Sequence, residues 1–131
     1  MDRVTLGASG LKVSPFALGT MTFGDPVDAD TSFELLDLAV EQGINFLDTA
    51  NSYNAGLTEE IIGKWLKARD HREQLVIASK VRYPVGNDSD SAGLSPRVIL
   101  QQLENSLKRL NTDYLDIYLL RSEEHTSELQ S

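Results

Sequence analysis

The sequence lacks cysteine: none of its 131 residues carries a thiol. Disulfides and thiolate metal sites are therefore excluded, and the composition is compatible with a reducing compartment. No apolar run approaches the roughly 20 residues that a membrane helix needs. The N-terminus also shows no charged segment followed by an apolar one, as a signal peptide would. We therefore expect a cytoplasmic protein that has no membrane association.

Basic residues are scarce. Twelve lysines and arginines face 20 aspartates and glutamates, which gives a formal net charge of -8. Such a chain repels the phosphate backbone, so we expect no nucleic-acid partner. The sequence holds two histidines and no cysteine, and we expect no metal site. Two nucleotide-binding motifs are missing as well, because no G-x-G-x-x-G follows a predicted strand and no G-x-x-x-x-G-K-[ST] occurs.

Short apolar runs alternate with helical patterns along the chain. Two such runs around the Gly7–Gly10 turn predict a β-hairpin. Four further runs read as strands, at residues 16–18, 45–47, 75–79 and 114–120. Helical patterns separate these strands: one begins near residue 31, one spans 58–68, and one begins at 96. Strict alternation of this kind predicts parallel strands that are joined by right-handed crossovers.

Two of the predicted helices carry clear start signals. Thr31 and Glu34 have the spacing of a capping box, which places the first helix start near Thr31. Ser95 followed by Pro96 predicts the N-terminus of the third helix. Apolar residues at helical spacing predict the buried face of that third helix: Ile99, Leu103, Leu107 and Leu110.

An alternating α/β chain without a dinucleotide fingerprint favours a (β/α)8 TIM barrel over a doubly wound sheet. Such a barrel takes roughly 250 residues, whereas this sequence supplies a hairpin and four strands. We therefore expect a barrel truncated to its N-terminal hairpin and first four strands, within residues 1–120. Half a barrel leaves open strand edges, so we expect poor solubility of the 131-residue chain.

The last eleven residues, 121–131, have a different character. They match, in one reading frame, the conceptual translation of a common sequencing-adapter oligonucleotide. We interpret residues 121–131 as a foreign, adapter-derived tail that is not part of the fold. His125 belongs to this tail.

Three polar residues follow predicted strands. Asp48 and Lys80 come where two successive strands end, and Tyr53 lies in the loop after Asp48. In a barrel, the loops after the strands carry the active site. A lysine ammonium favours the phenolate form of a nearby tyrosine and lowers its pKa, and an aspartate keeps that lysine charged. The sequence therefore predicts a tyrosine that can transfer a proton near neutral pH. Asp48 could instead cap the following turn, and Lys80 could lie at the surface.

Several stretches together resemble the aldo-keto reductase superfamily. The most specific is the block of residues 43–53, Gly-Ile-Asn-Phe-Leu-Asp-Thr-Ala-Asn-Ser-Tyr. The others are Leu18-Gly19-Thr20-Met21, Thr58-Glu59 with Gly63, Ser79-Lys80, and residues 106–110 with 114–116. The loop of residues 20–24 is most similar to the branch of bacterial general-substrate reductases and potassium-channel β-subunits.

This resemblance implies an NADP(H)-dependent reductase of small-molecule carbonyls on a (β/α)8 barrel. It implies a catalytic tetrad of Asp, Tyr, Lys and His, of which Asp48, Tyr53 and Lys80 match three, with Tyr53 as general acid. The fourth member would directly follow the fourth strand, where the sequence has Arg121. We interpret that histidine as lost with the truncation.

The resemblance also implies where the cofactor lies. The positions near the nicotinamide and its ribose match four residues: Gly19, Thr20, Met21 and Asp48. The family holds the cofactor phosphates through the last two strand loops, which this sequence does not contain.

The sequence is compatible with two other functions. A Schiff-base aldolase could use Lys80 as its nucleophile, although Asp48 and Tyr53 would then have no explanation. A channel-associated β-subunit could keep cofactor affinity and signal to a partner. The sequence leaves the substrate and the oligomeric state undetermined.

The adapter interpretation predicts the outcome of resequencing. Clean sequence from the source transcript should replace everything after about residue 120 with a longer reading frame, whose product we call the parent protein. A histidine at position 121 and a basic phosphate-binding loop near the end are expected. Recovery of the same tail from genomic DNA would contradict the interpretation.

Overall fold

The computed structural model describes residues 1–120. It opens with an antiparallel hairpin of β1 (Val4–Thr5) and β2 (Lys12–Val13), as the sequence predicts. The turn between them includes Gly7 and Gly10, both with positive φ, a conformation that glycine adopts without a steric penalty. The predicted foreign tail, with Arg121 and His125, lies outside the described residues.

Four parallel strands form a sheet in the spatial order β3-β4-β5-β6. Their bounds are β3 Ala17–Gly19, β4 Phe46–Asp48, β5 Val76–Lys80 and β6 Ile117–Leu119. Every neighbouring pair is parallel, which confirms the prediction of an α/β chain with crossovers. The register places Gly19 beside Asp48, and Asp48 beside Ala78. The carboxyl ends of the first three strands therefore meet at one edge of the sheet.

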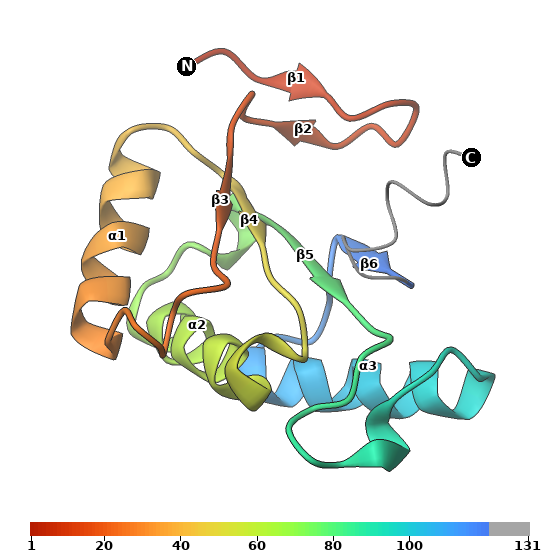
Figure 1. Ribbon diagram of the computed structural model, residues 1–131. Coiled ribbons are helices and arrows are strands. Elements are labelled where there is room, and N and C mark those ends of the chain that lie inside the picture. Colours follow the sequence, from red (N-terminus) through yellow and green to blue (C-terminus); the bar gives the residue numbers. More distant parts are fainter. Residues whose placement is uncertain (121–131) are drawn as a thin grey trace, which may run out of the picture.

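Helices connect the strands and lie on one side of the sheet, while the hairpin lies near the amino ends of the strands (Figure 1). The α-helices are α1 Ala29–Glu41, α2 Leu57–Ala68 and α3 Pro96–Leu110. Three short 3-10 segments are η1 Tyr53–Gly56, η2 Arg72–Gln74 and η3 Ser89–Ser91. No helix within residues 1–120 is both long enough and apolar enough to cross a bilayer.

The core lies between the sheet and these helices. Leu47 of β4 and Ile77 of β5 are fully buried, and they pack in one cluster with Leu36 of α1, Trp65 of α2 and Leu110 of α3. All five residues of β5 are buried. A continuous apolar run is typical of a strand covered on both faces, and β5 therefore occupies the interior that the sequence predicts for it.

Helix α1 begins earlier than the capping box predicts. It starts at Ala29, and the side chain of Asp28 accepts a hydrogen bond from the Thr31 amide at 2.8 Å. That hydrogen bond lowers the pKa of Asp28. Aspartate caps a helix as well as threonine does, and Asp28 stands three residues before the predicted start. The predicted cap at Thr31 is therefore wrong, because an equally strong capping residue precedes it.

The buried stripe of α3 differs from the predicted one. Leu110 is fully buried as predicted, but Ile99, Leu103 and Leu107 are half-buried. The residues that are buried instead are Val98, Gln102, Ser106 and Leu110. Apolar periodicity missed this face because two of its members, Gln102 and Ser106, are polar side chains that find hydrogen-bond partners in the interior.

Strand β6 is shorter than its apolar run suggests. The prediction was 114–120, whereas the structure has Ile117–Leu119. Tyr114 lies outside the strand, with the Arg72 guanidinium 3.8 Å from its ring centroid. The carboxylate of Asp116 accepts hydrogen bonds from the Ile77 amide at 2.9 Å and from Arg72 at 3.0 Å. These contacts hold residues 114–116 outside the regular ladder.

A buried carboxylate joins α2, α3 and β5. Glu59 of α2 is fully buried, and its oxygens accept hydrogen bonds from Ser79 at 2.7 Å, from Ser106 at 3.1 Å and from Arg109 at 2.8 Å. A buried charge needs such partners, because desolvation otherwise costs several kcal/mol. Gly63 lets the two helices approach closely: a Cβ there would collide with the backbone carbonyl of Arg109.

The network around Glu59 predicts a large and specific loss of stability. In the parent protein, Glu59→Gln should lower the free energy of unfolding by about 3–5 kcal/mol, because it leaves the Arg109 charge without its partner. Urea denaturation measures this change. Glu60→Gln is the matched control, since Glu60 is exposed and should change stability by about 0.5 kcal/mol or less. Equal effects of the two substitutions would contradict the assignment.

Candidate functional site

The carboxyl ends of β3 and β4 open onto one cavity of about 380 Å³. Its lining residues are Gly19, Thr20, Met21, Thr22, Asp48 and Tyr53. The set includes all four residues that the sequence assigns to cofactor binding and two of the three assigned to catalysis. The cavity lies at the end of the sheet where parallel α/β proteins bind their ligands.

The loop after β3 is fastened to the end of β4. Thr20 is fully buried, and both its amide and its hydroxyl donate to the Asp48 carbonyl, at 3.2 Å and 2.9 Å. Met21, the next residue, is 59% exposed at the cavity. The buried threonine therefore fixes the first turn of the loop and leaves the following side chain free to face a ligand.

Lys80 ends β5 and lies behind Asp48 and Tyr53. Its side chain is 8% exposed, whereas that of Asp48 is 41% exposed. The Lys80 Nζ donates to Asp48 Oδ1 at 2.9 Å, to the Tyr53 hydroxyl at 3.0 Å and to the Thr49 carbonyl at 3.0 Å. The structure thus brings together the three residues that the sequence selects, from two strand ends and one loop.

The charge on Lys80 is well supported. Burial works to lower the pKa of Lys80, but the hydrogen bonds with Tyr53 and Asp48 outweigh burial and raise that pKa above its ordinary value. The ammonium also lies 4.9 Å from the centroid of the Tyr53 ring, within the range of a cation–π contact. Lys80 is therefore a cation through the neutral range, held against a phenol hydroxyl.

Tyr53 reaches the cavity from η1, which follows β4 after a short buried turn. Asn51 in this turn is 1% exposed. Its amide donates to the Lys80 carbonyl at 3.2 Å, and its side chain donates to Gln102 at 3.2 Å. These bonds tie the loop that carries Tyr53 to β5 and α3. Neither motif spacing nor apolar periodicity points to Asn51 and Gln102 as partners, because their contact spans 51 positions of the chain.

Ser79, the neighbour of Lys80 in the chain, anchors the end of β5 to α2. Ser79 precedes Lys80 on β5, and its side chain points to the opposite face, as alternation along a strand requires. Its hydroxyl donates to the buried Glu59. The end of β5 is therefore anchored to α2 on one face while it presents an ammonium on the other. Glu59 belongs to a stretch that carries the family resemblance, but its contacts with β5 and α3 become visible only in the tertiary structure.

Tyr118 of β6 contrasts with this site. Burial first, and then the nearby Glu59 charge, raise the pKa of Tyr118 to about 12. Its hydroxyl donates to the Ile99 carbonyl at 3.4 Å. Such a phenol stays protonated near neutral pH and packs between strand and helix.

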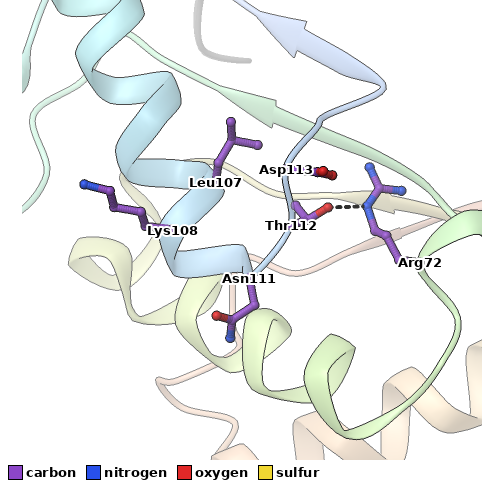
Figure 2. Close-up of a pocket in the computed structure, with 6 residues that line it drawn as sticks. All are labelled: Arg72, Leu107, Lys108, Asn111, Thr112 and Asp113. Atoms are coloured by element: carbon purple, nitrogen blue, oxygen red, sulfur yellow. Dashed lines mark hydrogen bonds between the residues drawn. The ribbon is translucent and has the colours of Figure 1, made fainter.

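A larger cavity, of about 660 Å³, lies at the other end of the sheet. Figure 2 shows its six lining residues around the end of α3: Arg72, Leu107, Lys108, Asn111, Thr112 and Asp113. The Arg72 guanidinium is engaged in the fold, since it donates to Thr112 at 2.9 Å and to Asp116 at 3.0 Å. This cavity lies near the amino ends of the strands, where barrels place stabilising contacts. Within residues 1–120, no cluster of histidine, aspartate and glutamate could hold a metal ion.

Comparison with known proteins places the chain in a family. The model of the Aldo/keto reductase family matches residues 15–129. The oxidoreductase YrpG of Bacillus subtilis, described as uncharacterized, is 46% identical, over 90% of this chain and 39% of its own length. The aldo-keto reductase YhdN of the same organism is 36% identical, over 90% of this chain and 37% of its own.

A solved structure shows the same architecture. The aldo-keto reductase AKR11C1 from Bacillus halodurans, in its holo form, superposes with a TM-score of 0.80 at 36% identity, over 98% of this chain and 43% of that one. The chain thus spans about two fifths of the length of the proteins it matches. The match confirms the predicted fold class, a (β/α)8 barrel represented by its hairpin and first four strands. The chain belongs to the aldo/keto reductase family.

Proposed function

We propose that the parent protein is an NADP(H)-dependent reductase that converts small-molecule aldehydes or ketones to alcohols, with Tyr53 as general acid. One observation carries this proposal: the Lys80 ammonium lies within hydrogen-bond distance of both the Tyr53 hydroxyl and the Asp48 carboxylate, beside the cavity. The chain covers about two fifths of its relatives, so the activity is assigned to the parent protein.

Proton transfer is the task of Tyr53. A carbonyl oxygen bound beside its hydroxyl receives the phenol proton, and the nearby Lys80 cation stabilises the phenolate that remains. Asp48 keeps that cation in place through its own hydrogen bond. The Thr49 carbonyl accepts a further hydrogen bond from Lys80, which directs the ammonium between the carboxylate and the phenol.

The residues at the cavity fit the nicotinamide end of a cofactor. Gly19 has open space where a Cβ would stand, so a flat ring can approach the backbone there. The partly exposed Asp48 carboxylate can accept a hydrogen bond from a ribose hydroxyl, and Thr20 and Met21 complete the wall. When bound, the nicotinamide supplies the hydride that reaches the carbonyl carbon. The six lining residues include no lysine or arginine, so the phosphates need side chains from other parts of the parent protein.

Two elements of this proposal lie beyond the described residues. The fourth tetrad member, a histidine expected at position 121, is assigned to the parent protein and replaced here by Arg121. The boundary between the barrel segment, residues 1–120, and the foreign tail, 121–131, belongs to the same proposal. A cytoplasmic location stays a prediction.

The site favours reduction over Schiff-base chemistry. A nucleophilic lysine must lose its proton, and enzymes achieve this by lowering the lysine pKa. The hydrogen bonds of Lys80 raise its pKa instead, and three acceptors surround its nitrogen. An aldolase that uses Lys80 is therefore disfavoured by the geometry that supports the reductase.

Removal of the phenol hydroxyl tests the general acid. In the parent protein, Tyr53→Phe should lower kcat for NADPH-dependent aldehyde reduction by about 100- to 10,000-fold, the usual contribution of general acid catalysis. The NADPH Kd, followed by fluorescence, should change little. Tyr114→Phe is the control, because Tyr114 lies away from the cavity. Tight NADPH binding without turnover by the wild type would instead favour a cofactor-binding regulatory protein.

The charge on Lys80 should set the alkaline limit of the reaction. Reduction needs the neutral phenol, so the rate falls as pH rises through the pKa of Tyr53. Lys80→Met removes the cation that lowers this pKa; the alkaline limb should therefore move upward by about 1–3 pH units, while the maximal rate decreases. The pH profile of kcat/KM measures both effects. Lys64→Met, on the exposed face of α2, should leave the limb in place, and an unmoved limb in Lys80→Met would refute the coupling.

A further inference from the structure

The residues that follow Tyr53 adopt an unusual backbone conformation. Asn54 has φ 51° and ψ 42°, and Ala55 has φ 55° and ψ 36°. Both angles lie in the left-handed region, which glycine occupies readily and which other residues rarely enter. Asparagine is one of the better-tolerated exceptions, whereas alanine gains nothing there. Two consecutive residues of this kind therefore need support from the surrounding structure.

The Asn54 side chain hydrogen-bonds the loop after β3 and the first turn of α2. Its Nδ2 lies 3.0 Å from the Met21 carbonyl, 2.9 Å from the Phe23 carbonyl and 3.2 Å from the Thr58 hydroxyl. The Thr58 hydroxyl itself donates to the Phe23 carbonyl at 2.6 Å. All three acceptors are oxygens, so the position needs a donor of two protons, which an asparagine amide provides.

These bonds link the two loops that form the cavity. Met21 belongs to the loop after β3, and Tyr53 belongs to the loop after β4; both residues line the cavity. Asn54 is adjacent to Tyr53 in the chain but is absent from that lining. Asn54 would therefore affect a bound ligand indirectly, by fixing the positions of Met21 and Tyr53. Gly24, in the loop after β3, also packs closely against Leu57 and Asn54: a Cβ there would stand 2.9 Å from Leu57 Cδ2 and 3.6 Å from Asn54 Nδ2.

We propose that Asn54 is a positioning residue for the general acid: its side-chain amide clamps the Tyr53 loop to the Met21 loop and so fixes the phenol relative to Lys80 and to the ligand. This inference rests on the proposed function of Tyr53. The backbone conformation alone would be served better by glycine. The observed asparagine thus adds what glycine lacks, a donor aimed at the opposite loop.

The decisive variants are Asn54→Gly and Ala55→Gly in the parent protein. Both place a glycine in the left-handed turn and both relieve backbone strain, but Asn54→Gly alone removes the clamp. We expect Asn54→Gly to lower kcat about ten- to a hundredfold, because small misplacements of reacting groups cost rates of this order. Its Tm and its NADPH Kd should stay near those of the wild type, whereas Ala55→Gly should keep kcat within about twofold.

A conservative variant sharpens the comparison. Asn54→Asp keeps the size of the side chain but turns an acceptor toward three acceptor oxygens. It should lose kcat at least as strongly as Asn54→Gly. Equal losses in Asn54→Gly and Ala55→Gly would show that loop stiffness matters and the clamp does not, and wild-type kcat in Asn54→Gly would overturn the proposal.

A second measurement separates this proposal from the proposed function. Tyrosine labelled with ¹³C at Cζ reports phenol ionisation by NMR, and Tyr53→Phe assigns the Tyr53 signal. Loss of the clamp should loosen the Tyr53 contact with Lys80 and raise the pKa of Tyr53 in Asn54→Gly, while Ala55→Gly leaves it unchanged. Absence of turnover in the wild type would refute the reductase, yet this titration would still confirm or overturn the clamp.

Discussion

The arrangement depends on one buried positive charge. The Lys80 ammonium lies at the end of a fully buried strand, where desolvation opposes its charged form. Three oxygens surround it: a carboxylate from the end of β4, a backbone carbonyl, and the phenol of η1. The requirement to satisfy this charge therefore constrains where the loop after β4 lies relative to the end of β5. The proposed proton transfer would use the same three contacts that satisfy this charge.

The opposite face of β5 carries a second charge network. Ser79 and Lys80 are adjacent, and alternation sends their side chains to opposite faces. Ser79 donates to Glu59, which also accepts from Arg109. Two helices are thus held against the strand directly behind the ammonium. Buried ion pairs are weak sources of net stability but costly to break, so this pair specifies position more than it adds free energy.

The parallel order, the strand ends and the residues at them could be predicted from the sequence, because they rest on local signals. The apolar run of β5 and the block around Asp48 are such signals. Two details could not be predicted. The sequence offers a second capping residue, Thr31, three positions after the true cap of α1 at Asp28. In α3, the apolar stripe in the sequence lies one position away from the face that is buried. The polar contacts between Asn51 and Gln102 and around Glu59 span 20 to 51 positions. Apolar periodicity predicts which apolar residues are buried. It cannot predict the burial of polar residues that form hydrogen bonds with one another in the interior.

The same distinction explains why Tyr53 needs more support than its partners. Asp48 and Lys80 are placed by the β-ladder itself, since each ends a strand with a fixed register. Tyr53 comes five residues after Asp48, in a 3-10 segment whose next two residues are left-handed. The amides of Thr49 and Asn51 still donate to carbonyls of β5, but Tyr53 comes two residues after the second of these hydrogen bonds. Side-chain hydrogen bonds of Asn51 before Tyr53 and of Asn54 after it hold the rest of this loop. The phenol is therefore held between two asparagines, whereas the carboxylate and the ammonium lie at strand ends.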